Sequence, residues 1–126
     1  MSNLTEEQLD YEVLFILSQH VGKENAISRW QLVEKVIGYV PEHLRTNNNM
    51  EDREVRDAVS RLRLQGHVIC DMGDGRGRYM AGSVEEFWEF YFYYLTPLLK
   101  GRKTLDALKK AAAEQWPDVQ QMRMEL

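Results

Sequence analysis

The sequence predicts a mainly α-helical protein with a small β-hairpin. Three segments begin with a capping box, a hydroxyl residue followed three positions later by Gln or Glu, which satisfies free amide groups at a helix start. They are residues 5–8, 28–31 and 83–86. Glycines at alternate positions separate two short β-prone runs, as in a hairpin. The chain has 126 residues, of which 44% are hydrophobic, so it can bury the core of one compact domain.

The first third of the chain predicts two helices joined by a short extended piece. Apolar residues that follow the first capping box share one helical face and predict a helix over residues 6–21. Residues 26–27 predict the extended piece. The second capping box opens a short helix that Gly38 closes.

A third helix is predicted after a loop. Residues 39–50 contain proline and an asparagine run, which favour a loop with one helical turn around 42–44. Asn48 or Asn49 can cap the helix that follows, which spans residues 50–65. Its apolar stripe consists of Val55, Ala58, Val59 and Leu62.

The β-hairpin is predicted over residues 67–81. The runs 67–71 and 78–81 are rich in β-forming residues, and glycine occupies every second position between them.

The C-terminal third predicts two further helices. Residues 87–95 are apolar or aromatic at every position except Glu89. Pro97 and Gly101 are expected to bend or break this helix, and a last helix is expected from residue 104 to about 115.

The order of these elements resembles the winged helix-turn-helix domains of bacterial and phage DNA-binding proteins. The resemblance covers about residues 8–82 and rests on three stretches: Ala26-Ile27-Ser28 before a short helix, the arginine-rich run 53–63, and Gly66-His67-Val68-Ile69 before the glycine-rich hairpin. The link between the second and third helices has about a dozen residues, whereas the family usually needs three or four.

The chain is expected to have three parts. Residues 5–82 would form the winged helix-turn-helix domain, 83–117 an aromatic-rich helical extension for packing or dimerisation, and 118–126 a frayed tail. Similar sequences are typical of phage and mobile-element genes.

The third helix carries the candidate DNA-binding residues. At 100° per residue, Arg53, Arg56, Ser60 and Arg63 cluster about 130° from the apolar stripe. Arginine can bind guanine through two hydrogen bonds and also reaches phosphates. The resemblance implies that the helix reads bases and the hairpin contacts the flank. The candidates are Arg29, Arg53, Arg56, Ser60, Arg63, Arg76 and Arg78.

The charge pattern alone also allows a solvated, ion-paired helix face. Six acidic residues balance the six arginines between residues 51 and 82. The whole chain has a net charge of −4 and a pI near 5.4, which excludes a uniformly basic nucleic-acid coat but not a local basic patch.

The aromatic helix predicts an interface. A helix that is apolar all round must be buried on more than one side. The candidate interface residues are Trp88, Tyr91, Phe92, Tyr94 and Leu95. They can pack on the last helix, on a second copy of the chain, or on another protein. A homodimer is favoured because it presents two reading helices to a repeated half-site.

Other classes of protein find little support in the sequence. The three histidines and Cys70 lack the spacing of zinc ligands, and no catalytic motif is present, so we expect no cofactor, no metal and no enzymatic activity. The single cysteine, the absence of a signal-peptide pattern and the absence of a membrane-length apolar run predict a cytoplasmic protein without a membrane partner.

Two functional hypotheses follow. The first is a sequence-specific protein that binds double-stranded DNA, either a transcriptional regulator or a phage or mobile-element factor for replication or maintenance. The alternative is a winged-helix protein-interaction module that binds and inhibits or recruits another protein without contacting DNA.

Overall fold

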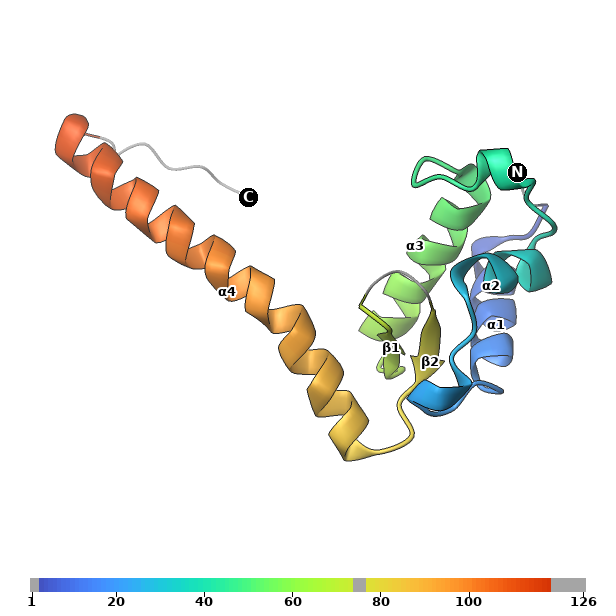
Figure 1. Cartoon of the computed structure of the whole chain (residues 1–126). Helices are drawn as coiled ribbons and strands as arrows, with labels where there is room; N and C mark the ends of the chain where they lie inside the picture. Colours follow the sequence, from blue (N-terminus) through green and yellow to red (C-terminus); the bar gives the residue numbers. More distant parts are fainter. Residues whose placement is uncertain (1–2, 74–76, 119–126) are drawn as a thin grey trace. The chain divides into compact units, whose positions relative to one another are not determined.

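The computed structural model describes residues 3–73 and 77–118, and these residues form a mainly helical structure with one antiparallel hairpin (Figure 1). This confirms the predicted fold class. The chain divides into two compact units, Met1–Phe90 and Tyr91–Leu126.

The described residues contain four α-helices, two short 3₁₀ turns and two strands. In chain order they are α1 (Glu6–Leu17), a turn at Lys23–Asn25, α2 (Arg29–Val36), a turn at Glu42–Leu44, α3 (Met50–Leu64), β1 (Ile69–Asp71), β2 (Arg78–Met80) and α4 (Val84–Gln115).

Side-chain caps fix the starts of the first three helices. Thr5 and Ser28 each form a complete capping box, as predicted. Asn49 caps α3, because its side-chain oxygen accepts a hydrogen bond from the backbone N–H of Asp52 at 2.8 Å. The predicted cap is therefore Asn49 and not Asn48.

Helix α1 ends at Leu17, four residues earlier than predicted. The chain beyond it pairs with β2: the Met80 N–H donates to the His20 carbonyl and the Gly22 N–H donates to the Met80 carbonyl. Gly22 has a φ of +91°, a conformation that favours glycine. These residues act as an added strand instead of a last helical turn.

The hairpin is widened by the predicted extended piece at Ile27. Strands β1 and β2 pair with Cys70 opposite Tyr79. On the other edge of β2, Ile27 and Arg78 exchange two backbone hydrogen bonds of 2.9 Å each.

The core lies among α1, α2, α3 and the hairpin. All four residues of the predicted α3 stripe are buried. The buried apolar residues of this core are Leu9, Val13, Leu17, Ile27, Leu32, Val33, Val40, Val55, Ala58, Val59, Leu62 and Ile69. The tightly packed core holds α3 and the hairpin in fixed positions. Side chains on their surfaces can therefore form a site with a fixed geometry.

The C-terminal segment forms one helix of 32 residues, so the predicted break near Pro97 and Gly101 is wrong. Proline in a helix interior removes one hydrogen bond of the ladder, and Gly101 adds only a small propensity cost. Next to Pro97, the Thr96 hydroxyl donates to the Phe92 carbonyl at 2.7 Å. The predicted end near residue 115 is confirmed.

The first turn of α4 is held on the Met1–Phe90 unit by Glu86. Ser83 accepts from the Glu86 N–H at 3.2 Å, as the third capping box predicts. The Glu86 carboxylate instead accepts from the backbone N–H groups of Lys23 and Gly82. These hydrogen bonds lower the pKa of Glu86, because they favour its ionised form.

Candidate nucleic-acid interface

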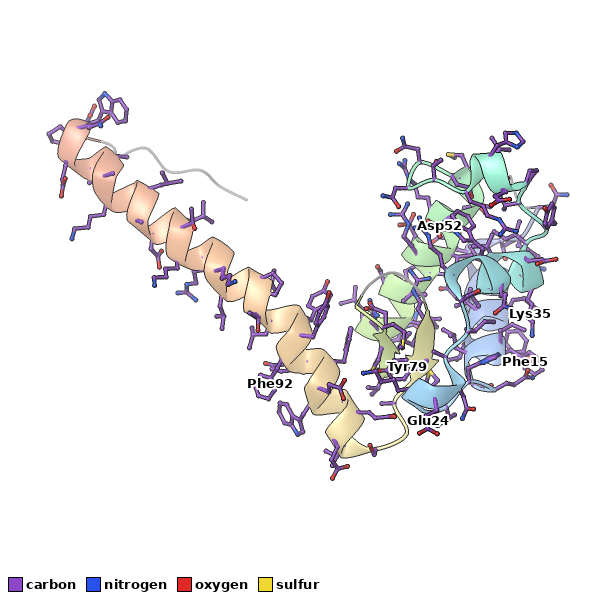
Figure 2. All side chains as sticks on the ribbon, viewed as in Figure 1. Phe15, Glu24, Lys35, Asp52, Tyr79 and Phe92 are labelled. Atoms are coloured by element: carbon purple, nitrogen blue, oxygen red, sulfur yellow. The ribbon has the colours of Figure 1, made fainter. Side chains whose placement is uncertain are left out.

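Asp52 is a fully buried carboxylate that organises the arginines around it. Figure 2 labels its position in the fold. Arg29, at the start of α2, donates to both of its oxygens, with Nε 2.9 Å from Oδ1 and Nη2 2.6 Å from Oδ2. The Nε of Arg56, one turn further along α3, lies 2.9 Å from Oδ2. One buried negative charge therefore holds two guanidinium groups in place.

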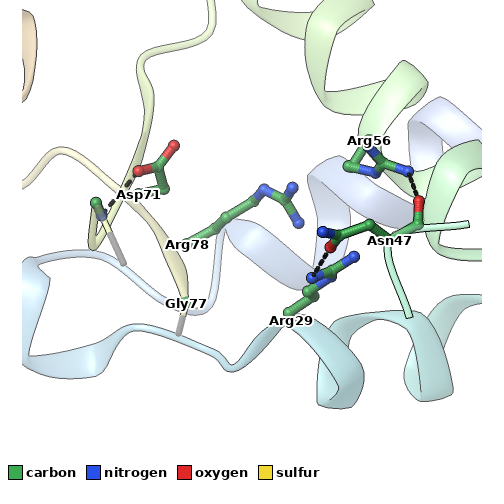
Figure 3. Close-up of a pocket in the computed structure, with 7 residues that line it drawn as sticks. Arg29, Asn47, Arg56, Asp71, Gly77 and Arg78 are labelled. Carbon is green, nitrogen blue, oxygen red and sulfur yellow. Dashed lines mark hydrogen bonds between the residues drawn. The ribbon is translucent and has the colours of Figure 1, made fainter. Parts of the chain in front are cut away.

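Asn47 ties the loop before α3 to the same two arginines. Its side-chain oxygen accepts from Arg29 at 3.0 Å, and its backbone carbonyl accepts from Arg56 at 3.0 Å (Figure 3). The hydrogen bond from Arg29 to Asp52 raises the pKa of Arg29, which remains charged.

These groups line a pocket of about 220 Å³ between α2, α3 and the hairpin. Its lining residues are Arg29, Asn47, Arg56, Asp71, Gly73, Gly77 and Arg78. We call Arg29, Arg56 and Arg78 the arginine triad. The pocket is smaller than the sites that usually hold drug-sized ligands, so it fits a small group such as one phosphate.

The guanidinium group of Arg78 is the least well hydrogen-bonded of the triad. Its Nη1 atom is shielded from solvent and has no hydrogen-bond partner among the described residues. Burial lowers the pKa of Arg78, because the protein around it solvates the charge less well than water does. Figure 3 shows its guanidinium pointing toward Asn47 and Arg56. A buried guanidinium N–H without an acceptor favours an anionic ligand at this point.

Arg63 fastens α3 to the hairpin. Its Nε donates to the Ile69 carbonyl at 2.8 Å, and its Nη2 lies 3.5 Å from a carboxylate oxygen of Asp71. Its guanidinium also lies over the Phe90 ring, 5.2 Å from the ring centre. These contacts occupy the Arg63 side chain within the fold.

Arg53 and Ser60 lie on the outward face of α3. Both are exposed, together with Asp57 and Leu64 at the same helical positions. Neither side chain makes a hydrogen bond or an ion pair with the part of the chain that the structure describes. They are available to an external ligand.

Six of the seven predicted DNA-binding residues thus fall into three groups. Arg29, Arg56 and Arg78 converge on one pocket. Arg53 and Ser60 lie on the outward face of α3 and are exposed to solvent. Arg63 is engaged within the fold. Arg76 lies outside the described residues.

Sequence reasoning missed the part played by Asp52 and Asn47. Asp52 lies in the first turn of α3, where an acidic residue is favourable at a helix start without any further role. One signal pointed further: Asp52 and Arg56 are four residues apart, the spacing of an ion pair on one helix face. Asp52 and Arg29 are 23 residues apart in the sequence, so no helical spacing indicated their contact.

The pocket has a positive balance in an acidic chain. The triad and Arg63 carry four positive charges, and Asp52 and Asp71 carry two negative charges. The net charge of these six described residues is therefore +2, against −4 for the whole chain. Local charge decides whether a phosphate can approach within a few ångströms, because salt screens more distant charges.

The predicted interface residues of α4 form a second candidate surface. Trp88, Tyr91, Phe92 and Tyr94 are exposed, and Leu95 is half-buried. Phe92 is labelled on α4 in Figure 2. Large apolar side chains gathered on a surface indicate a binding partner.

Comparison with known proteins gives no assignment: no family model, no curated protein and no solved structure matches this chain. None of the helices in the described ranges is both long enough and apolar enough to cross a membrane.

Proposed function

We propose that this chain binds double-stranded DNA, with the arginine triad holding a backbone phosphate and α3 presenting Arg53 and Ser60 to bases. The convergence of Arg29, Arg56 and Arg78 on one pocket carries this proposal. The resemblance to winged helix-turn-helix domains supports the same class of protein, either a transcriptional regulator or a replication or maintenance factor.

The chemistry of the pocket suits a phosphate. Guanidinium groups bind phosphate oxygens through short, charge-assisted hydrogen bonds, and arginine does so with a fixed fork geometry. Asp52 neutralises one of the three charges and fixes two of the side chains, so little ordering remains to be done when a phosphate binds.

The outward face of α3 suits base reading. Phosphate contacts fix the position of a protein on the duplex, and side chains in the groove then read the sequence. Arg53 is exposed and uses none of its donors within the described part of the fold, so it can approach a guanine edge.

The test is fluorescence anisotropy with a labelled random duplex of about 25 base pairs, a little over two helical turns. Titration at two salt concentrations should show binding that weakens steeply with salt, because phosphate contacts release counterions. Absence of binding at low salt would overturn the proposal.

The first variant is Arg53→Gln. We expect it to weaken binding to a selected site by roughly 1–3 kcal/mol, the usual contribution of one arginine–guanine contact. The unfolding midpoint should not change, because the Arg53 side chain makes no hydrogen bond or ion pair with the described residues. Lys35→Gln is the matched control, since Lys35 is an exposed cation at the end of α2. Equal losses for the two variants would contradict a specific role for Arg53.

The second variant is Arg78→Met, which keeps a long apolar side chain and removes the charge. We expect the slope of log affinity against log salt to fall by about 0.9, the value for one lost phosphate contact. The free energy of unfolding should stay constant or rise, because a buried guanidinium nitrogen, here Nη1, without a hydrogen-bond partner among the described residues is destabilising. A loss of stability with unchanged DNA binding would assign Arg78 a purely structural role.

A protein-interaction module is the second candidate function, favoured by the exposed aromatic residues of α4. It predicts that the full chain binds a protein and ignores DNA at low salt. In that case both variants above would be silent in the duplex titration, and substitutions on α4 would abolish partner binding.

A further inference from the structure

The arginine triad keeps hydrogen-bond donors that the fold does not use. Each guanidinium group has five N–H donors. Among the described residues, Arg29 uses two of them on Asp52 and one on Asn47. Arg56 uses one on Asn47, and the buried Nη1 of Arg78 has no partner among those residues. Every member of the triad therefore keeps donors for a ligand in the pocket.

Packing and pairing hold the triad in place before any ligand binds. The guanidinium of Arg29 lies over the Trp30 ring, 4.8 Å from the ring centre, in addition to its bonds to Asp52. The backbone of Arg78 is fixed by two hydrogen bonds with Ile27. A fixed set of donors cannot rearrange to suit a poor match, so it selects ligands by their charge and by the number of their acceptors.

One carboxylate in the pocket lining is compensated outside the triad. Nη2 of Arg63 lies 3.5 Å from one oxygen of Asp71, and the backbone N–H of Gly73 donates to the other oxygen at 2.9 Å. The charges of Arg63 and Asp71 cancel. The three arginines of the triad and Asp52 then face the ligand with three positive charges and one negative charge, a net +2.

A net charge of +2 matches a phosphate monoester better than a phosphodiester. Each phosphodiester of a DNA backbone carries one negative charge. The phosphate group of a monoester carries close to two negative charges at neutral pH and has three strong acceptor oxygens. A monoester dianion can therefore neutralise the site and offer one oxygen to each guanidinium of the triad.

We propose that the arginine triad binds the terminal phosphate of a phosphate monoester as a dianion, in preference to the phosphodiester of a DNA backbone. The pocket of about 220 Å³ holds little more than the phosphate group, so the rest of the ligand lies outside it. Such a ligand competes with duplex DNA and thereby regulates its binding. This competition rests on the proposed function, whereas binding of the monoester does not.

The first test is calorimetric titration of the full chain with methyl phosphate and with dimethyl phosphate, which differ by one methyl group and one charge. Near pH 7.5 and at constant ionic strength, we expect methyl phosphate to bind one site at least about tenfold more tightly, because the site attracts the second charge. Equal affinities for the two compounds, or no heat from methyl phosphate at millimolar concentration, would overturn the proposal.

The matched variants are Arg78→Met and Arg102→Met. Arg78→Met should lower the affinity for methyl phosphate at least about tenfold, because it removes the buried donors and one charge of the triad. Arg102→Met makes the same change at an exposed position of α4 and should leave the affinity unchanged. Equal effects of the two substitutions would contradict a specific site. Circular dichroism of both variants shows whether the fold is kept.

The pH dependence tests the charge of the ligand. A phosphate monoester loses its second proton with a pKa near 6, so its dianionic fraction falls roughly tenfold between about pH 7.5 and pH 5. The affinity for methyl phosphate should fall by the same factor. Sulfate stays dianionic over this range, and its affinity should not fall. Protonation of Asp52 or Asp71 would strengthen the binding of both anions, which is the opposite trend. A parallel fall for both anions, or no fall for methyl phosphate, would contradict selection of the dianion.

Duplex titrations identify the source of the monoester. Tighter binding of a duplex with 5′-phosphates than of the same duplex with 5′-hydroxyls assigns the ligand to a strand end. Equal binding, with displacement of the duplex by methyl phosphate and not by dimethyl phosphate, assigns it to a free phosphorylated molecule. A chain that binds methyl phosphate and no duplex would refute the proposed function alone. A chain that binds duplex and no methyl phosphate would refute this inference alone.

Discussion

Replacing Asp52 with asparagine is expected to lower the free energy of unfolding by about 3 kcal/mol. This is the low end of the range for breaking a buried ion pair, because Arg29 and Arg56 are both partly exposed. Asparagine keeps the size of the side chain but removes the charge that two guanidinium groups share. Chemical denaturation monitored by circular dichroism measures the loss.

The same change should also weaken duplex binding. Without the carboxylate, Arg29 and Arg56 repel each other and no longer hold Asn47 in place. Asp57→Asn is the matched control on the same helix, since Asp57 is exposed, and it should change stability by less than about 0.5 kcal/mol. If Asp52→Asn were as mild as its control, Asp52 would not be the organising residue of the pocket.

The local features of the fold were predictable from the sequence. Capping boxes at Thr5 and Ser28 involve residues three positions apart, and the α3 stripe involves one helix face, so each is encoded within a few residues. The hairpin followed from its glycines for the same reason. The sequence therefore predicted the order and type of the elements in the Met1–Phe90 unit.

The candidate site was predicted only in part, because it is assembled from three distant segments. The sequence placed Arg56 and Arg63 together on one helix face, but in the fold Arg56 joins Arg29 and Arg78 while Arg63 binds the hairpin. Angular position on a helix says which way a side chain leaves the backbone. It does not say which loop or strand the side chain then meets.

Helix α4 shows the limit of a rule based on single residues. Proline and glycine are helix breakers on average, and the sequence placed both between two helical patterns. A helix passes through such residues when the residues on either side favour the same helix strongly enough to compensate the lost hydrogen bond. The predicted break was wrong because the helix propensity of the whole segment, and not of Pro97 and Gly101 alone, decides whether the helix continues.

Replacing Gly77 with alanine should have the other large effect on the fold. A Cβ atom at this position would lie 2.7 Å from the Ile27 carbonyl oxygen and 3.3 Å from its carbonyl carbon. Both are backbone atoms, so no side chain can move aside. Relief requires that β2 separate from Ile27, which breaks the two backbone hydrogen bonds that position Arg78.

We therefore expect Gly77→Ala to lower the free energy of unfolding by about 1–3 kcal/mol, the usual cost of overpacking, and to weaken duplex binding because Arg78 shifts. Gly101→Ala is the control: apart from its own stretch of helix backbone, no atom of the described residues lies within 4 Å of its added Cβ, and alanine favours a helix more than glycine does. It should cause no loss of stability. If Gly77→Ala left the free energy of unfolding unchanged, β2 would not pair closely with Ile27. The arrangement of the pocket described above, which depends on this pairing, would then be wrong.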